Sequence, residues 1–406
     1  MIVTLVRKHH LAALIWLLAL LSFALPMAGC SDVQTGSVVA KIDEIARPYA
    51  FDLWGWETRA LLDKATTSVR EWHTTGSCTE SDVVRYFSLS AEKQRIIETL
   101  GENATTRPRL ESINREQAVL AGCVEKLLAS QVHRALIANG IGNPFGSWAR
   151  PEVFPPVLFR LDEPPKVLVI SPRERILVWH RVTLRQDLTL QQREQIEANC
   201  DRLGVSSLVE DTGGMATYPS MVTANGDIRY TLDTVIEEWV HQYLTFKPLG
   251  FRYLLDIWGI RRDPEAASIN ETLAGMVARE LADIVYREHY MGQESAPGRK
   301  PAFDFNREMR ATRAKVDELL ASGQIATAEQ YMEERRQFFV RNGYYIRKLN
   351  QAYFAFYGVY GHNPASVSPA YGDLQRLRLR SLSLADFLER AASITSYSEL
   401  RALVSD

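Results

Sequence analysis

Apolar residues recur at helical spacing through the N-terminal third of the chain. Between residues 38 and 64 they fall three or four positions apart, and Pro48 divides the run. Ser90 resembles a helix N-cap and would open a new helix. A third apolar period covers residues 112–138. The pattern predicts that residues 38–140 are mostly helical.

Beyond residue 150, short β-rich runs are followed by long helical ones. Two of the runs, joined by Ser-Pro-Arg-Glu, predict a hairpin. A later extended run contains Pro219, which predicts a sheet edge because proline has no ladder donor. The chain is therefore expected to be α+β and predominantly helical, with a small edge-stranded sheet. The expected elements are strands at 166–170, 175–182, 206–210 and 213–222, and helices at 188–203, 234–244, 268–286, 306–322, 326–343, 345–357 and 384–404.

The helix expected at 234–244 carries three ionisable residues among apolar ones, in the string Glu-Glu-Trp-Val-His. Glu237 and His241 lie four residues apart and therefore on one face, and Glu238 is adjacent. Buried carboxylates and imidazoles need hydrogen-bonding partners or a metal. This spacing makes the helix the first candidate for chemistry.

A second acidic motif, Asn-Glu-Thr-Leu-Ala, lies on the helix expected at 268–286 and contains Glu271. Glu271 has two interpretations. It is a candidate metal ligand, or it completes a capping box with Ser268, which is three residues before it.

Together, the edge strand and the two motifs resemble the gluzincin division of zinc metallopeptidases, over residues 165–290. That group carries H-E-x-x-H on one helix and N-E-x-x-A on a later one. Some bacterial membrane-attached proteins described as aminopeptidase-like share E-W-x-H-Q-Y-L and N-E-T-x-A. The resemblance implies a zincin-like core in which Glu238 is the general base and Glu237, His241 and Glu271 bind the metal. It also implies that the edge strand pairs with a peptide substrate, through Gly214, Met215, Ala216 and Thr217.

The sequence departs from the family at Glu237, which stands where the first zinc-binding histidine is expected. A carboxylate can bind zinc, so a Glu/His/Glu site is chemically feasible. More negative ligands activate water less and favour harder metals such as manganese or iron. The family also implies a late tyrosine that stabilises the oxyanion, for which Tyr353, Tyr357 and Tyr360 are candidates. Aromatic core packing is the alternative for these tyrosines.

The first thirty residues predict targeting. Arg7 and Lys8 precede an apolar run that ends in Met-Ala-Gly-Cys30, which resembles a bacterial lipobox. Cys30 is then the lipidated residue, and an uncleaved membrane anchor is the alternative. Either interpretation predicts an extracytoplasmic, tethered protein. The expected regions are a signal peptide at 1–30, a helical region at 31–150, the zincin-like core at 151–290 and a helical region at 291–406.

Composition narrows the function little further. A net charge of −2 gives no electrostatic argument for binding nucleic acid. Beyond Cys30, three cysteines remain, and a bridge between Cys78 and Cys123 is one possibility that leaves Cys200 free.

The expected function is a membrane-tethered metallopeptidase acting on a peptide or protein. A catalytically degenerate zincin fold that acts as a binding or scaffold module is the alternative. A di-iron carboxylate site would need a second E-x-x-H, and the adjacent Glu288 and His289 do not provide it.

Overall fold

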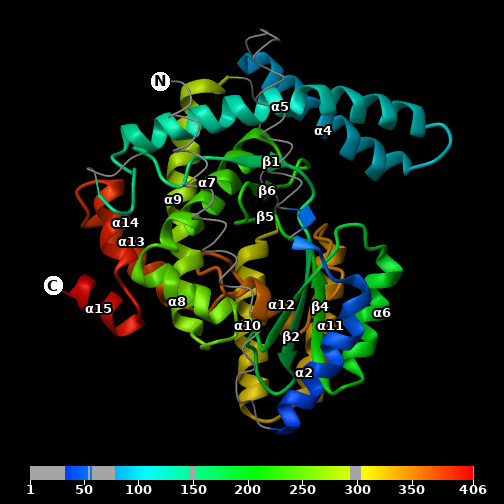
Figure 1. Ribbon diagram of the computed structural model, residues 1–406. Coiled ribbons are helices and arrows are strands. Elements are labelled where there is room, and N and C mark those ends of the chain that lie inside the picture. Colours follow the sequence, from blue (N-terminus) through cyan, green and yellow to red (C-terminus); the bar gives the residue numbers. More distant parts are fainter. Residues whose placement is uncertain (1–32, 54, 57–77, 147–150, 293–302, 406) are drawn as a thin grey trace.

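The fold was analysed in a computed structural model, which describes residues 33–53, 55–56, 78–146, 151–292 and 303–405. The chain is predominantly helical, with 61% helix and 8% strand, so the predicted α+β helical class is confirmed at that level. Its elements form two lobes, a helical lobe and a sheet lobe (Figure 1). Within the described ranges, no helix is long and apolar enough to cross a membrane.

The helical lobe is built around one large apolar core, to which α4, α5, α7, α9, α13 and α14 all contribute buried side chains. Helices α7 and α9 stand side by side at its centre, and α5 crosses above them (Figure 1). The elements of this lobe are α4 (Glu80–Leu100), α5 (Arg107–Ala138), β1 (Phe159–Leu161), β5 (Gly214–Met215), β6 (Ser220–Val222), α7 (Ile228–Leu244), α8 (Pro248–Ile257), α9 (Pro264–His289), α13 (Ala370–Leu379), α14 (Leu384–Ala392) and α15 (Tyr397–Ser405).

The sheet lobe is organised by an antiparallel sheet of order β3-β2-β4. Successive side chains of β2 point to opposite faces of the sheet. Leu168 and Ile170 pack toward α2 and α6, whereas Val169 packs toward α12. Helices α10 and α11 form a further apolar cluster with α12. The elements are α2 (Val33–Ala46), η1 (Arg47–Tyr49), β2 (Lys166–Pro172), β3 (His180–Leu184), α6 (Leu190–Asp201), β4 (Val205–Glu210), α10 (Phe305–Ala321), α11 (Ile325–Arg341) and α12 (Gln351–Tyr357).

A second sheet of three short strands, in the order β1-β6-β5, lies against α7. Strand β1 runs parallel to β6, and β5 runs antiparallel to β6 with Gly214 opposite Val222. Strand β5 is thus an edge strand, as predicted, while β6, which follows Pro219, lies in the middle of the sheet. The Gln242 side chain fixes α7 to this sheet, because its Nε2 donates to the Thr217 carbonyl and to the Ser220 hydroxyl.

Ser90 and Ser268, each predicted to begin a helix, lie inside longer helices, for the same physical reason. Ser90 lies in the middle of α4, which begins after Thr79, and its hydroxyl donates to the carbonyl of Ala224. Ser268 lies inside α9, whose N-cap is Asp263, and its hydroxyl donates to Ser368. Both serines satisfy their hydroxyls through distant segments rather than by capping. The capping-box interpretation of Glu271 is therefore also wrong.

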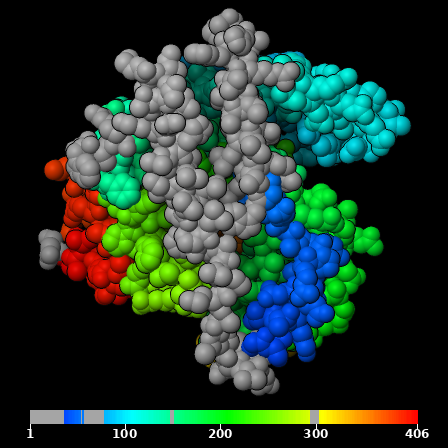
Figure 2. Space-filling model, viewed as in Figure 1, coloured from blue at the N-terminus to red at the C-terminus, as the bar shows by residue number. Residues whose placement is uncertain are grey.

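The α4–α5 hairpin projects from the rest of the surface (Figure 2). A disulfide between Cys78 and Cys123 ties the segment before α4 to the middle of α5, and Cys200 is free and buried. This disulfide is the pairing that the sequence suggested as one possibility. The lipobox and Cys30 lie outside the described residues.

Candidate metal centre

The packing of α7 against α9 brings three predicted metal ligands to one point. Glu237 and His241 are one turn apart on α7, and Glu271 faces them from α9. One ligand atom from each of the three residues lies within 4.8 Å of the other two. Two carboxylates and an imidazole at this separation can hold one divalent metal ion.

The imidazole of His241 is oriented for this role. Its Nδ1 lies 2.7 Å from Oδ1 of Asn270. Because an amide oxygen only accepts, Nδ1 carries a hydrogen, and Nε2 is the nitrogen left to bind a metal in place of a proton. Nε2 lies 3.6 Å from a carboxylate oxygen of Glu271, so it faces the ligand cluster. An outer hydrogen bond of this kind typically fixes a metal-binding histidine.

Glu271 is buried and is held from its far side. The hydroxyl of Tyr253, on α8, donates to Oε1 of Glu271. Oε2 is the oxygen that faces His241. Glu237, in contrast, receives no hydrogen bond from any described residue. The cluster therefore has one fixed carboxylate, one fixed imidazole and one carboxylate without a donor, a set that fits a cation.

The electrostatics of the cluster also favour a cation. Burial raises the pKa of Glu237 to about 7 and that of Glu238 to about 8, and neighbouring carboxylates add to both shifts. Burial lowers the pKa of His241, but the charge of Glu271 and the other carboxylates outweighs it and raises that pKa to about 10. Burial raises the pKa of Glu271, but His241 and Tyr253 outweigh it and lower that pKa. A proton on His241 thus balances part of the negative charge of the carboxylates. A bound divalent ion would balance that charge in place of the proton.

Glu238, the predicted general base, touches the edge strand. A Cβ atom added at Gly214 would lie 2.4 Å from Oε1 of Glu238 and 2.7 Å from Cγ2 of Thr234. Only a residue without a side chain lets the backbone pass this close. The base and the predicted substrate-binding strand are consequently in direct contact.

The four residues predicted to bind substrate are not equivalent. Gly214 and Met215 form β5, and on one side their backbone pairs with β6. Ala216 follows the strand. The carbonyl of Thr217 accepts from Gln242, and its hydroxyl donates to the carbonyl of Pro219, so its polar groups are used inside the protein.

The tyrosines predicted to act as oxyanion donors separate into two groups. Tyr353 and Tyr357 lie on α12, with ring centroids 4.5 Å apart. Burial raises the pKa of both, and the charge of Glu210 raises it further. Tyr360 lies beyond the end of α12, and there the charge of Glu271 and burial raise its pKa well above the usual value. Of the three tyrosines, Tyr360 is the one whose pKa is raised by the charge of a predicted metal ligand.

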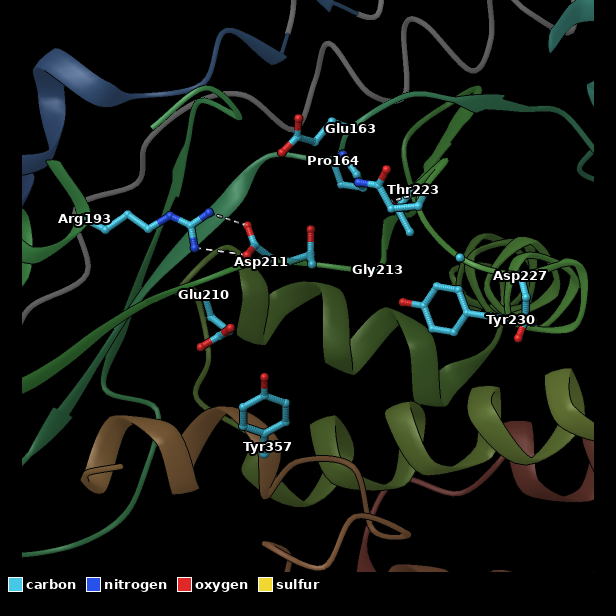
Figure 3. Close-up of a pocket in the computed structure, with 13 residues that line it drawn as sticks. Glu163, Pro164, Arg193, Glu210, Asp211, Gly213, Thr223, Asp227, Tyr230 and Tyr357 are labelled. Carbon is cyan, nitrogen blue, oxygen red and sulfur yellow. Dashed lines mark hydrogen bonds and ion pairs between the residues drawn. The ribbon is translucent and has the colours of Figure 1, made fainter. Parts of the chain in front are cut away.

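A pocket of about 620 Å³ adjoins the start of the edge strand (Figure 3). None of the three ligands lines it. The Tyr230 hydroxyl points toward Gly213, and Arg193 bonds both carboxylate oxygens of Asp211. Tyr357 points toward Glu210 from below. The remaining lining residues are Glu163, Pro164, Thr212, Thr223, Asn225, Gly226 and Asp227, so the wall is mainly polar, with four carboxylates and one arginine.

Four residues beside the cluster were not predicted as part of it: Asn270, Tyr253, His362 and Arg181. A Cβ at Gly275 would lie 3.6 Å from both Oε1 of Glu237 and Cε1 of His362, which places the His362 ring beside Glu237. Burial lowers the pKa of His362 to about 4, so its ring is neutral. The Asn-Glu motif could have suggested Asn270, since it precedes Glu271, but no sequence spacing links the other three.

Two other sets of potential metal-binding side chains have structural roles instead. Cys78, Asp82 and Cys123 lie within ligand distance of one another, but the two sulfurs are joined as a disulfide. His289 hydrogen-bonds Glu80 through Nδ1 at 2.7 Å, which links α9 to α4.

The chain was also compared with known proteins. No protein-family model, curated protein or solved structure matches it.

Proposed function

We propose that this protein is a metal-dependent hydrolase of peptides with a zincin-like core. The observation that carries the proposal is the convergence of Glu237, His241 and Glu271 beside a carboxylate, Glu238, that touches an edge strand. A hydrolase of this type needs these three parts: a metal site, a base and a means of holding the peptide main chain.

Each part has a chemical role in the proposal. Glu237, His241 and Glu271 would hold a divalent ion, which would supply Lewis acidity. Glu238 accepts the proton of the attacking water, a role suited to a carboxyl whose pKa is raised to about 8. The unpaired side of β5 accepts the substrate as an added strand. Tyr360 is the candidate donor to the developing oxyanion.

The proposed metal is zinc, with manganese or iron as the alternatives. Two carboxylates and one imidazole make a harder donor set than two imidazoles and one carboxylate, because Glu237 replaces a nitrogen ligand by oxygen. The same replacement favours a second candidate function, a zincin-fold binding or scaffold module without turnover. The extra negative charge weakens activation of water, so binding could persist where hydrolysis does not.

The proposed location is the cell envelope, where a lipid on Cys30 tethers the chain. The disulfide between Cys78 and Cys123 supports an oxidising compartment. Lipid labelling that Cys30→Ala abolishes is the expected result. Wild-type protein without lipid would favour the uncleaved anchor.

Replacement of the base distinguishes hydrolase from scaffold. Metal-loaded wild type and Glu238→Gln are assayed on a broad peptide library, with Glu288→Gln, an exposed glutamate, as control. Loss of a general base should slow cleavage by about 10²–10⁴-fold while metal content stays unchanged. Cleavage by Glu238→Gln at the wild-type rate would reject the assigned base. Absence of cleavage by the wild type would favour the scaffold.

A further inference from the structure

Arg181 brings a positive charge from the sheet lobe to the ligand cluster of the helical lobe. It lies on β3, an edge strand of the larger sheet, where it pairs with Val169. Burial and the charge of Glu271 raise the pKa of Tyr253, whose hydroxyl donates to Glu271, and the charge of Arg181 opposes that rise. The charges of Arg181 and Glu271 therefore act on each other across the two lobes.

The guanidinium is incompletely satisfied. Its Nε is buried and has no hydrogen-bond partner. No carboxylate of the described residues lies within 4.0 Å of it, although Glu271 and Asp256 act on it from a greater distance. Arg181 is partly buried, so a cation without a contacting counter-ion at this position is open to an anionic partner. Arginine is the residue that best binds a carboxylate through two parallel hydrogen bonds.

The charges at the centre agree with an anionic ligand. A divalent ion would balance Glu237 and Glu271, which leaves the Arg181 guanidinium without a contacting counter-charge. An anionic group on a ligand bound at the lobe interface would supply one, and such interfaces are a common place for ligands to bind.

We infer that Arg181 is a specificity residue that binds a carboxylate of the ligand next to the metal centre. The inference rests on the proposed function only in naming the ligand as a peptide. The carboxylate belongs either to a peptide C-terminus or to an acidic side chain. Both sources present the same group to the guanidinium, so the probes below separate them.

Binding to a non-cleaving protein tests this inference without turnover. Metal-loaded Glu238→Gln protein is titrated calorimetrically with N-acetyl-trialanine, with its C-terminal amide, and with N-acetyl-Ala-Glu-Ala amide. At least one carboxylate probe is expected to bind at least about tenfold tighter than the uncharged amide, consistent with one charge-assisted pair. The probe that does so identifies the source of the carboxylate.

Replacement of the guanidinium then tests its role. Adding Arg181→Gln should reduce the preference to about one. Arg181→Lys, which keeps the charge but not the fork, should reduce it at least about threefold. Arg185→Gln is the matched control, because Arg185 follows the same strand but pairs with Asp187 and lies over Tyr49. It should leave the preference unchanged.

The outcomes separate this inference from the proposed function. Equal binding of all three probes, no binding of either carboxylate probe, or a preference that survives both Arg181 substitutions would overturn the role of Arg181. Equal loss of affinity for all three probes would assign Arg181 a structural role as counter-charge to Glu271 and would also overturn it. A preference that depends on Arg181, in a protein that cleaves no peptide, would keep the inference and reject the hydrolase.

Discussion

His241 hydrogen-bonds Asn270 through the ring nitrogen that points away from the ligand cluster, at 2.7 Å. Asn270 immediately precedes Glu271, so a single turn of α9 supplies one ligand and orients another. The N-E pair therefore works as a unit, in which the asparagine acts through His241 rather than on a metal.

Asn270→Ala should weaken metal binding without removing a ligand. Loss of an outer hydrogen bond to a metal-binding histidine typically costs 10–100-fold in affinity, so a loss of about that size is expected. The measurement is a competition titration with a chromophoric chelator. Asn342→Ala, at the exposed end of α11, is the control and should bind metal like the wild type. Unchanged affinity in Asn270→Ala would separate Asn270 from the centre.

Gly214→Ala should impair both folding stability and peptide binding. The added Cβ would lie 2.4 Å from Oε1 of Glu238, so either strand or carboxylate must move. Overpacking of this kind costs about 1–3 kcal/mol in free energy of unfolding. Gly36→Ala meets no atom within 4 Å and lies in α2, so it should be neutral or slightly stabilising. Urea unfolding checks both variants, and a fully stable Gly214→Ala would show that the strand does not touch Glu238.

Asp233 should make stability depend on pH. Burial and the charge of Asp283 raise its pKa to about 6, against the opposing charge of Arg279, and one carboxylate oxygen has no partner. Because the folded pKa is above the ordinary value of 3.8, the charged form is penalised in the folded state above pH 6. The penalty is relieved as the pH falls from 6 toward 4, where the folded state takes up the proton first.

Asp233→Asn removes this penalty. It should stabilise the protein by about 2–3 kcal/mol at pH 7.5 and have little effect at pH 4, from 1.36 kcal/mol for each pKa unit. Denaturant titrations at the two pH values provide the test. Asp187→Asn, at an exposed position, should change neither value. An effect of equal size at both pH values would contradict the raised pKa.

The disulfide should contribute strongly to stability. It joins residues 45 positions apart, for which loop-closure entropy predicts about 4 kcal/mol. Reductant should lower the urea midpoint of the wild type and leave that of the Cys78→Ser, Cys123→Ser double variant unchanged. Equal midpoints with and without reductant in the wild type would show that the bridge contributes little.

Local patterns predicted the elements that carry the centre. The helical spacing of apolar residues around Glu237 and His241 predicts α7, which is confirmed. Pro219 predicted a sheet edge for the whole extended run, but only β5 is an edge strand and β6, which follows Pro219, is central. The helix prediction succeeded because periodicity acts within one element. The ligand triad required only that two neighbouring helices pack in the way their apolar faces allow.

Tertiary contacts account for what the sequence did not predict. Ser90 and Ser268 carry local capping signals, but each hydroxyl finds a partner far along the chain. Arg181 reaches the centre from another lobe, and no spacing rule relates a residue on β3 to Glu271. Tyr360 has the same kind of placement. The sequence offers Tyr360 as a candidate together with Tyr353 and Tyr357, since all three share one aromatic-rich stretch, but it favours Tyr353 and Tyr357 as the catalytic residues.

Metal content is the most direct test of the central claim, that Glu237, His241 and Glu271 form one metal site. The protein is purified without chelator, loaded with zinc or manganese, and analysed by mass spectrometry for metal per chain. We expect about one ion per wild-type chain, almost none in His241→Ala, and a wild-type value in His133→Ala, whose histidine lies on α5. A wild type that takes up neither metal, or a His241→Ala variant that retains the full amount, would contradict the account.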